Sequence, residues 1–155
     1  MENPKQNDDI SEEIMQFFNG GGTLAEIYDL SPTTLETLYQ AGYQYYNGGS
    51  YKDAEKIFRF LCTFDHFTVK HFFALGSCLQ MQRQYQTAID TYSYASLIDS
   101  NDPRFPYHAA ECQLMLGRKK EASSGFYAAS LHKGKHSQFD NLCLDAAMRH
   151  RRLQE

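Results

Sequence analysis

The chain has 155 residues, of which 42% are hydrophobic and 22% are charged, and its formal net charge is −4. This length and composition predict one globular domain with a sizeable core. The mild negative charge gives no basis for nucleic-acid binding, and no apolar run reaches the ~18 residues of a membrane helix. Since the polar start "MENPKQNDDISEE" does not read as a signal peptide, we expect a cytoplasmic protein without direct membrane insertion.

The first predicted element is a short amphipathic helix inside an N-terminal segment, residues 1–30. Ile10, Ile14 and Phe17 share one helical face, and three consecutive glycines then end the helix. A helix this short is marginal on its own. We therefore expect its apolar face to dock on the body of the protein or on a second copy, which makes these three residues candidates for dimerisation.

Residues 31–134 contain a repeat with a period of 34 residues. It is anchored by three alanines, each followed four positions later by an aromatic residue and preceded twelve positions earlier by a small one. The three sets are Ala54, Phe58 and Gly42; Ala88, Tyr92 and Gly76; and Ala122, Phe126 and Ala110. A 34-residue helix–turn–helix unit with this pattern is the tetratricopeptide repeat, in which small residues let the two helices approach closely. The fold prediction is all-α: three repeats, at about 35–68, 69–102 and 103–134, stacked as an α-solenoid.

Helix boundaries follow from capping residues and turn signals. Ser31 is placed to cap the first repeat helix and Pro32 to open it. The second repeat is expected to turn near Arg83 and the third at Gly117, while Pro106 displaces the start of the third repeat. The remaining segment, 135–155, is predicted to form one helix that caps the last repeat.

Tyrosines in "LYQAGYQYYNGG" (38–49) separate into two faces of the first repeat helix. Tyr39, Tyr43 and Tyr46 fall on one stripe that faces the groove, whereas Tyr45 falls at a position expected to be core. Later repeats continue the groove with Phe73, Ser77, Met81, Tyr107, Glu111 and Leu114. Rigid aromatics and adaptable methionine are typical of peptide-binding surfaces, so an apolar, extended segment is the expected ligand. The alternative is that one of the terminal helices folds back and fills the groove.

Catalytic and metal sites are not indicated by the histidines and cysteines. Cys62 and His66 are four residues apart without further ligands at zinc-site spacing. Cys78 and Cys112 occupy equivalent repeat positions, which suggests small buried hydrophobic residues. We expect no cofactor, no metal and no enzymatic activity.

The chain resembles the class II chaperones of bacterial type III secretion, the low-calcium-response H family, over roughly residues 10–132. The most specific stretches are "GGTLAEIYDLS" (21–31), "FRFLCTFDHF" (58–67) and "DPRFPYHAAECQL" (102–114). The resemblance implies a chaperone that holds two hydrophobic translocator proteins before export and binds an extended, proline-containing client segment in the groove. It implies groove contacts at Tyr39, Tyr43, Tyr46, Phe73 and Tyr107, with Phe67 and His108 as neighbours.

The same family implies a weak homodimer formed through the N-terminal helix. A second function stays open from the sequence, that of a regulatory adaptor whose groove binds a transcriptional regulator or another soluble partner. A more distant alternative is an enzyme with a cryptic site. Gene neighbourhood would discriminate between the first two, since translocators carry long apolar helices.

Overall fold

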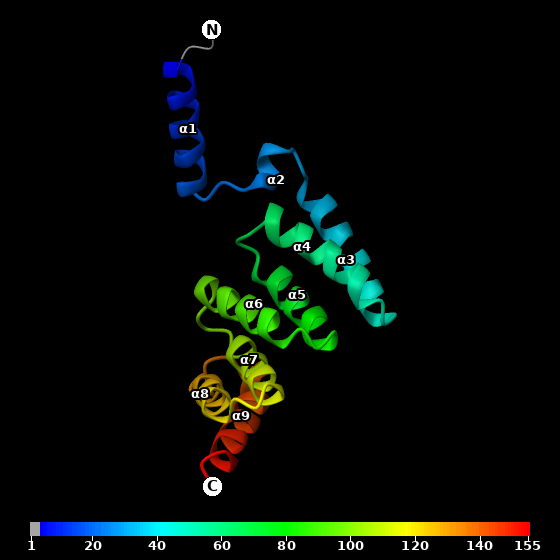
Figure 1. Cartoon of the computed structure of the whole chain (residues 1–155), viewed down its shortest axis with the longest axis vertical. Coiled ribbons are helices and arrows are strands. Elements are labelled where there is room, and N and C mark those ends of the chain that lie inside the picture. The colour runs from blue at the N-terminus through cyan, green and yellow to red at the C-terminus, as the bar shows by residue number, and fades with distance from the viewer. Residues whose placement is uncertain (1–3) are drawn as a thin grey trace.

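The computed structural model describes residues 4–155, with side chains described from residue 12 onward. Helices follow one another along this part of the chain, without β-strands (Figure 1). The elements are α1 (Pro4–Asn19), α2 (Leu24–Ile27), α3 (Pro32–Asn47), α4 (Tyr51–Phe64), α5 (Val69–Met81), α6 (Tyr85–Ile98), α7 (Arg104–Met115), α8 (Lys119–Ser130), the 3-10 helix η1 (Ser137–Phe139) and α9 (Asp140–Arg152).

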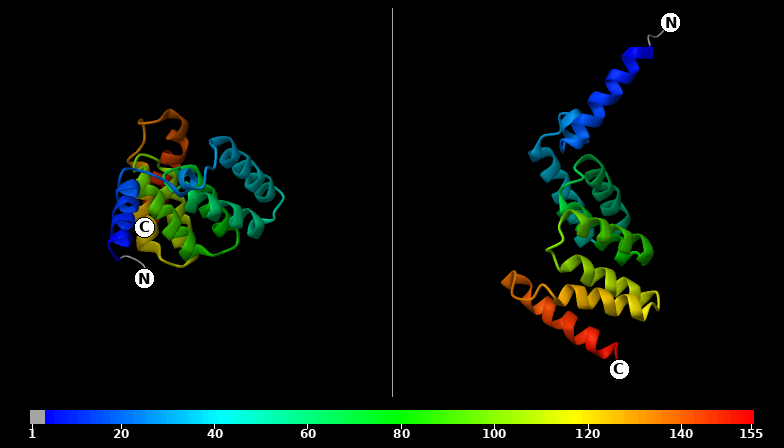
Figure 2. Two further views of the ribbon diagram at one scale, coloured as in Figure 1. Left: turned by 90° about the horizontal axis from the view of Figure 1, so that it is seen from above. Right: turned by 90° about the vertical axis from the view of Figure 1, so that its left-hand side faces the viewer.

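Helices α3 to α8 form three antiparallel pairs that stack along the long axis of the molecule (Figures 1 and 2). Each pair packs internally and against the next pair, as in a solenoid. This confirms the predicted fold class. The helices α3, α5 and α7, one from each repeat, form the side of the stack that we call the groove face.

The turns and caps form where the sequence indicates them. Ser31 caps α3 by accepting a hydrogen bond from the backbone N–H of Thr34 at 3.1 Å, and Pro32 is the first residue of the helix. Gly117 has a φ of 75°, and Arg83 has a φ of 61° at the turn between α5 and α6. A non-glycine residue in this region is uncommon. The third repeat starts at Arg104, with Pro106 inside the first turn, where its missing N–H costs no helical hydrogen bond.

The repeat positions form the core, as the 34-residue period predicts. The three alanines Ala54, Ala88 and Ala122 are fully buried, and the aromatic residues Phe58, Tyr92 and Phe126 are no more than 1% exposed. An aromatic ring of one helix lies against the small residue of its partner helix. An ideal Cβ built on Gly76 would lie only 2.5 Å from the ring of Tyr92, so this close approach requires glycine.

The prediction for Tyr45 is wrong. Its side chain is 47% exposed, whereas Leu79, the equivalent residue of the second repeat, is fully buried. Leu79 lies on α5, which packs against α4 of the preceding repeat. No repeat precedes α3, and α2 packs on α4 rather than on α3, so nothing in the described part of the chain covers Tyr45.

The N-terminal segment contains a second helix that the repeat pattern does not reveal. Thr23 and Glu26 form a capping box around α2, in which the Thr23 side chain accepts from the Glu26 N–H and the Glu26 side chain accepts from the Thr23 N–H. The stretch "TLAE" carries this signal in the sequence. Helix α1 precedes it and projects away from the repeats (Figure 2).

Exposed apolar side chains lie on α1. Ile14 is 47% exposed and Phe17 is 37% exposed, while the side chain of Ile10 lies outside the described residues. The face that we expect to dock is thus open along the described part of the helix.

At the other end of the chain, the expected capping helix is divided into η1 and α9. Helix α9 packs on α8 through Cys143 and Ala146, both essentially buried, and also contacts α7. Its last turn carries Arg149, His150, Arg151 and Arg152, which complement the partial negative charge at a helix C-terminus.

Candidate peptide-binding groove

A pocket of about 290 Å³ opens on the groove face and is walled mainly by aromatic side chains. Five of the nine predicted groove residues line it, namely Tyr39, Tyr43, Tyr46, Phe73 and Ser77. Phe58, Ala74 and His108 complete the lining. We call these eight residues the aromatic pocket.

Helix α3 contributes the three tyrosines of the stripe, but they differ in burial. Tyr43 is 49% exposed, whereas Tyr39 and Tyr46 are partly buried and pack against the core. The ring of Tyr39 meets Phe58 edge-on at 5.5 Å between centroids. Burial raises the pKa of both Tyr39 and Tyr46, so their hydroxyls stay protonated at neutral pH and present no negative charge to an apolar ligand.

Two cations lie on the rings at the edge of the pocket. The Lys70 ammonium is 4.6 Å from the centre of the Tyr39 ring, and the Arg104 guanidinium is 4.6 Å from that of Phe73. Each cation is neutralised by a carboxylate of its own. Lys70 pairs with Glu36 at 2.5 Å, and Arg104 pairs with Asp102 at 2.6 Å. The pocket is therefore apolar with a charge-balanced rim.

The other predicted groove residues lie outside the aromatic pocket. Met81 is 49% exposed at the end of α5, and Leu114 is partly buried against the core of the third repeat. Tyr107 is only 8% exposed, because its ring packs on Phe126 and its hydroxyl donates a hydrogen bond to Asp145 of α9 at 2.5 Å. Helix α9 thus covers the Tyr107 end of the groove face. The alternative in which a terminal helix folds back and fills the groove therefore holds at this end only, since the aromatic pocket stays open.

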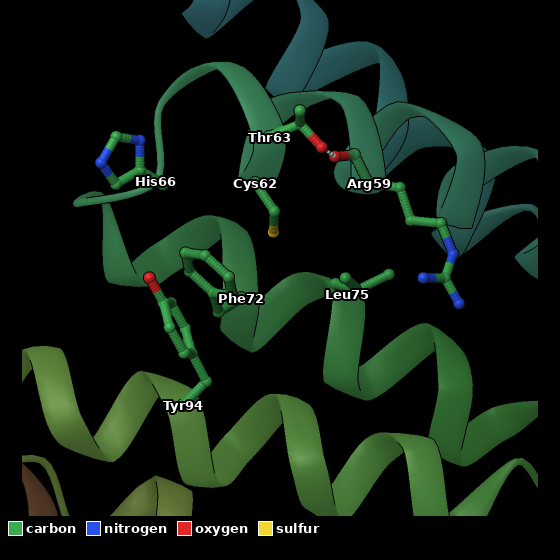
Figure 3. Close-up of a pocket in the computed structure, with 7 residues that line it drawn as sticks. All are labelled: Arg59, Cys62, Thr63, His66, Phe72, Leu75 and Tyr94. Atoms are coloured by element: carbon green, nitrogen blue, oxygen red, sulfur yellow. Dashed lines mark hydrogen bonds between the residues drawn. The ribbon is translucent and has the colours of Figure 1, made fainter. Parts of the chain in front are cut away.

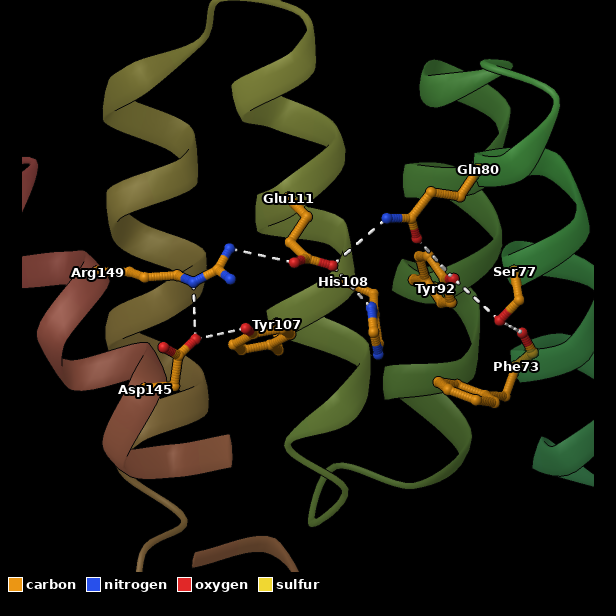
Figure 4. Close-up of polar contacts among 9 residues, drawn as sticks. All are labelled: Phe73, Ser77, Gln80, Tyr92, Tyr107, His108, Glu111, Asp145 and Arg149. Atoms are coloured by element: carbon orange, nitrogen blue, oxygen red, sulfur yellow. Dashed lines mark hydrogen bonds and ion pairs between the residues drawn. The ribbon is translucent and has the colours of Figure 1, made fainter. Parts of the chain in front are cut away.

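Glu111 joins the pocket to α9 through a polar network on the groove face (Figure 4). It accepts from His108 Nδ1 at 3.0 Å, from Gln80 Nε2 at 3.4 Å and from Arg149 Nη1 at 3.1 Å. Arg149 also pairs with Asp145 at 2.7 Å. Sequence reasoning missed Arg149 and Asp145; their spacing of four residues indicates an ion pair on one helix, and nothing in it indicates the contact with α7.

A separate hollow of about 370 Å³ lies between α4, α5 and α6, and it shares no lining residue with the aromatic pocket (Figure 3). Cys62 and His66, the pair noted in the sequence, both line it, and no hydrogen bond joins their side chains. Burial raises the pKa of the Cys62 thiol to about 12, and the same cause acts on Cys78 and Cys112. These thiols are protonated near neutral pH and are poor nucleophiles.

Among the side chains of residues 12–155, no cluster of three or more histidine, cysteine, aspartate or glutamate residues is suited to hold a metal ion. None of the described helices combines the length and the apolar character that crossing a membrane requires.

A stack of three tetratricopeptide-like repeats with an open aromatic pocket on its groove face defines a peptide-binding scaffold. A family model described as anaphase-promoting complex, cyclosome, subunit 3, matches residues 47–129. The low calcium response locus protein H of Yersinia pestis is 46% identical over 113 residues, which are 73% of this chain and 67% of that protein. The chain belongs to the family of type III secretion translocator chaperones.

Solved structures agree with this assignment. A type III secretion complex from Aeromonas hydrophila matches with a TM-score of 0.88 at 40% identity, over 92% of this chain and 95% of that one. PcrH of Pseudomonas aeruginosa, crystallised with the chaperone-binding region of PopD, matches with a TM-score of 0.78 at 42% identity, over 81% of this chain and 94% of that one.

Proposed function

We propose that this protein is a non-enzymatic chaperone of the bacterial cytoplasm that binds hydrophobic translocator proteins before their export by a type III secretion system. The observation that carries the proposal is the aromatic pocket, open at Tyr43 and walled by three repeats. In support, PcrH has been crystallised with regions of PopD and PopB, and SycD with a peptide of the translocator YopD.

The client segment in this proposal is short, extended and apolar. An aromatic pocket of this size takes one or two side chains, and each well-placed anchor contributes ~2 kcal/mol or more to binding. Such a chaperone shields a client whose long apolar segments would otherwise aggregate or insert into the wrong membrane. No cofactor and no hydrolysis step are required, because binding alone holds the client.

The test compares two tyrosines of the same helix. Tyr43 is 49% exposed and lines the pocket, whereas Tyr45 is 47% exposed and does not. Tyr43→Ala should weaken binding of a fluorescent peptide from the PopD chaperone-binding region about tenfold or more, at an unchanged melting temperature. Tyr45→Ala should bind like the wild type.

Equal loss in both variants would exclude the pocket as the binding site. A pull-down from the native lysate, analysed by mass spectrometry, distinguishes a chaperone from a regulatory adaptor. Recovery of proteins with long apolar segments supports the chaperone. If the wild type recovers only a soluble regulator or enzyme, the protein is a regulatory adaptor on the same fold.

We also propose that the protein forms a weak homodimer through α1. The exposed Ile14 and Phe17 support this contact, and a SycD structure is described as an alternative dimer. An aspartate at Ile14 would have to be desolvated in the dimer, so Ile14→Asp should raise the dimer dissociation constant in sedimentation-equilibrium experiments at least tenfold. Glu12→Asp, on the same exposed helix, serves as the control; an unchanged constant in Ile14→Asp would place the contact elsewhere.

A further inference from the structure

His108 stands out among the pocket residues because it brings a polar atom into an aromatic wall. Its ring stacks on Tyr92 at 5.8 Å between centroids and meets Phe73 edge-on at 5.4 Å. The side chain is 27% exposed, so one part of the ring is packed and another part faces the open pocket.

The carboxylate of Glu111 fixes which ring nitrogen of His108 carries the proton. Burial acts to raise the pKa of Glu111, but the hydrogen bond from His108 and the nearby positive charges outweigh it, so the pKa is lowered. An ionised carboxylate is only an acceptor. Nδ1 of His108, 3.0 Å from Glu111 Oε2, therefore donates to it, and in the neutral form of the imidazole the lone pair lies on Nε2.

Helix α9 holds Glu111 in this position. Arg149 contributes a donor at 3.1 Å to Glu111 and is itself held by Asp145 at 2.7 Å. Figure 4 shows this chain of contacts running from α9 across α7 to the pocket, with the second nitrogen of His108 at the far end of the ring from Glu111.

Nε2 of His108 has no hydrogen-bond partner among the described side chains and backbone groups, and it is accessible. Across residues 12–155, the side-chain nitrogens and oxygens that are fully buried without a partner belong to His71 and His132. Nε2 of His108 is not among them, so it is not fully buried. The hydroxyls in the pocket lining can each donate or accept, and that of Ser77 already donates to the Phe73 carbonyl at 2.9 Å. In the neutral imidazole, Nε2 is therefore an acceptor whose direction is fixed, in a pocket walled mainly by aromatic rings.

We propose that Nε2 of His108 accepts a hydrogen bond from a main-chain N–H of the bound client, next to the residue whose apolar side chain fills the aromatic pocket. This inference rests on the proposed function and adds a rule of specificity to it. Glu111 and Arg149 are positioning residues, which act by holding the ring in one orientation and one tautomer. Proline has no N–H, so the client residue that donates this hydrogen bond cannot be proline. A client that contains a proline must therefore bind with a different residue opposite His108.

The decisive variant is His108→Phe, because it keeps an aromatic ring and makes the pocket more apolar. If His108 served only as an aromatic wall, this variant would bind an apolar segment as tightly as the wild type or more tightly. We expect instead that it binds the PopD-region peptide about three- to tenfold more weakly, the loss of one hydrogen bond. His108→Gln, whose side-chain oxygen reaches a similar place, should recover part of the affinity.

The same peptide, N-methylated at one residue at a time, locates the hydrogen bond. At one position, N-methylation should weaken binding of the peptide to the wild type but not to His108→Phe. A merely structural role of His108 would not produce this coupling. If His108→Phe is unstable, His108→Gln takes its place in the comparison, and a wild-type scan in which no N-methylated position loses affinity refutes the inference without any variant.

The outcomes separate this inference from the proposed function. If the wild type binds neither the PopD-region peptide nor a YopD peptide, both are overturned. If it binds but His108→Phe binds as tightly and no N-methylated position couples to His108, the chaperone function stands and the hydrogen bond is refuted.

Discussion

Gly76→Ala tests the close approach on which the repeat depends. A Cβ at this position would lie 2.5 Å from Cε1 and 2.7 Å from Cζ of Tyr92, whereas carbon atoms in contact prefer about 3.5–4.0 Å. The overlap is therefore about 1 Å. The Tyr92 ring cannot easily withdraw, since it is fully buried, its hydroxyl donates to Gln80 at 3.1 Å and its face stacks on His108.

The net effect follows from two opposing contributions. Overpacking of this degree costs about 3 kcal/mol, and replacing a mid-helix glycine by alanine gains about 1 kcal/mol in helix propensity. We therefore expect Gly76→Ala to lower the free energy of unfolding by about 2 kcal/mol. For a chain of this size the melting temperature should fall by about 4–8 °C.

The measurement is thermal and urea unfolding followed by circular dichroism at 222 nm. Gly48→Ala is the matched control, because its φ is −78° and a Cβ there would meet nothing closer than 3.4 Å. Gly42→Ala should lie between the two, since its Cβ would be 2.9 Å from Phe58. A Gly76→Ala protein as stable as the Gly48→Ala protein would refute the close-packing argument.

Two further perturbations test other parts of the core. Ala88 is fully buried at the interface of the second repeat, so Ala88→Trp should destabilise the protein by about 3 kcal/mol or prevent folding; an unchanged melting temperature would contradict the repeat register. His71 is 1% exposed, and burial lowers its pKa below 6.5 despite the opposing hydrogen bond with Asp65 at 3.0 Å. The unfolded chain then binds the proton more readily, so stability should be complete above about pH 6.5 and fall as the pH decreases below it. Urea unfolding at pH 7.5 and pH 5.5 measures this loss, which should be smaller in His71→Gln; an equal loss in both proteins would assign it to other groups.

The sequence by itself determined the repeat. Its period placed Ala88, Tyr92 and Gly76 in one interface, because the same local contacts recur at the same spacing whatever lies outside the repeat. Ser31 and Gly117 likewise marked a cap and a turn, since capping and left-handed backbone are local properties.

Only the tertiary structure decided how each helical face is used. Tyr45 and Leu79 occupy equivalent positions, yet one is exposed and the other buried, because a preceding helix pair exists only for the second. Tyr107 was expected in an open groove, and α9 covers it through Asp145, a contact between residues 38 positions apart. The role of His108 depends on Glu111 and, through it, on Arg149. A helical pattern shows which side chains share a face. The residues that bury those side chains, or orient them by hydrogen bonds, come from elsewhere in the chain.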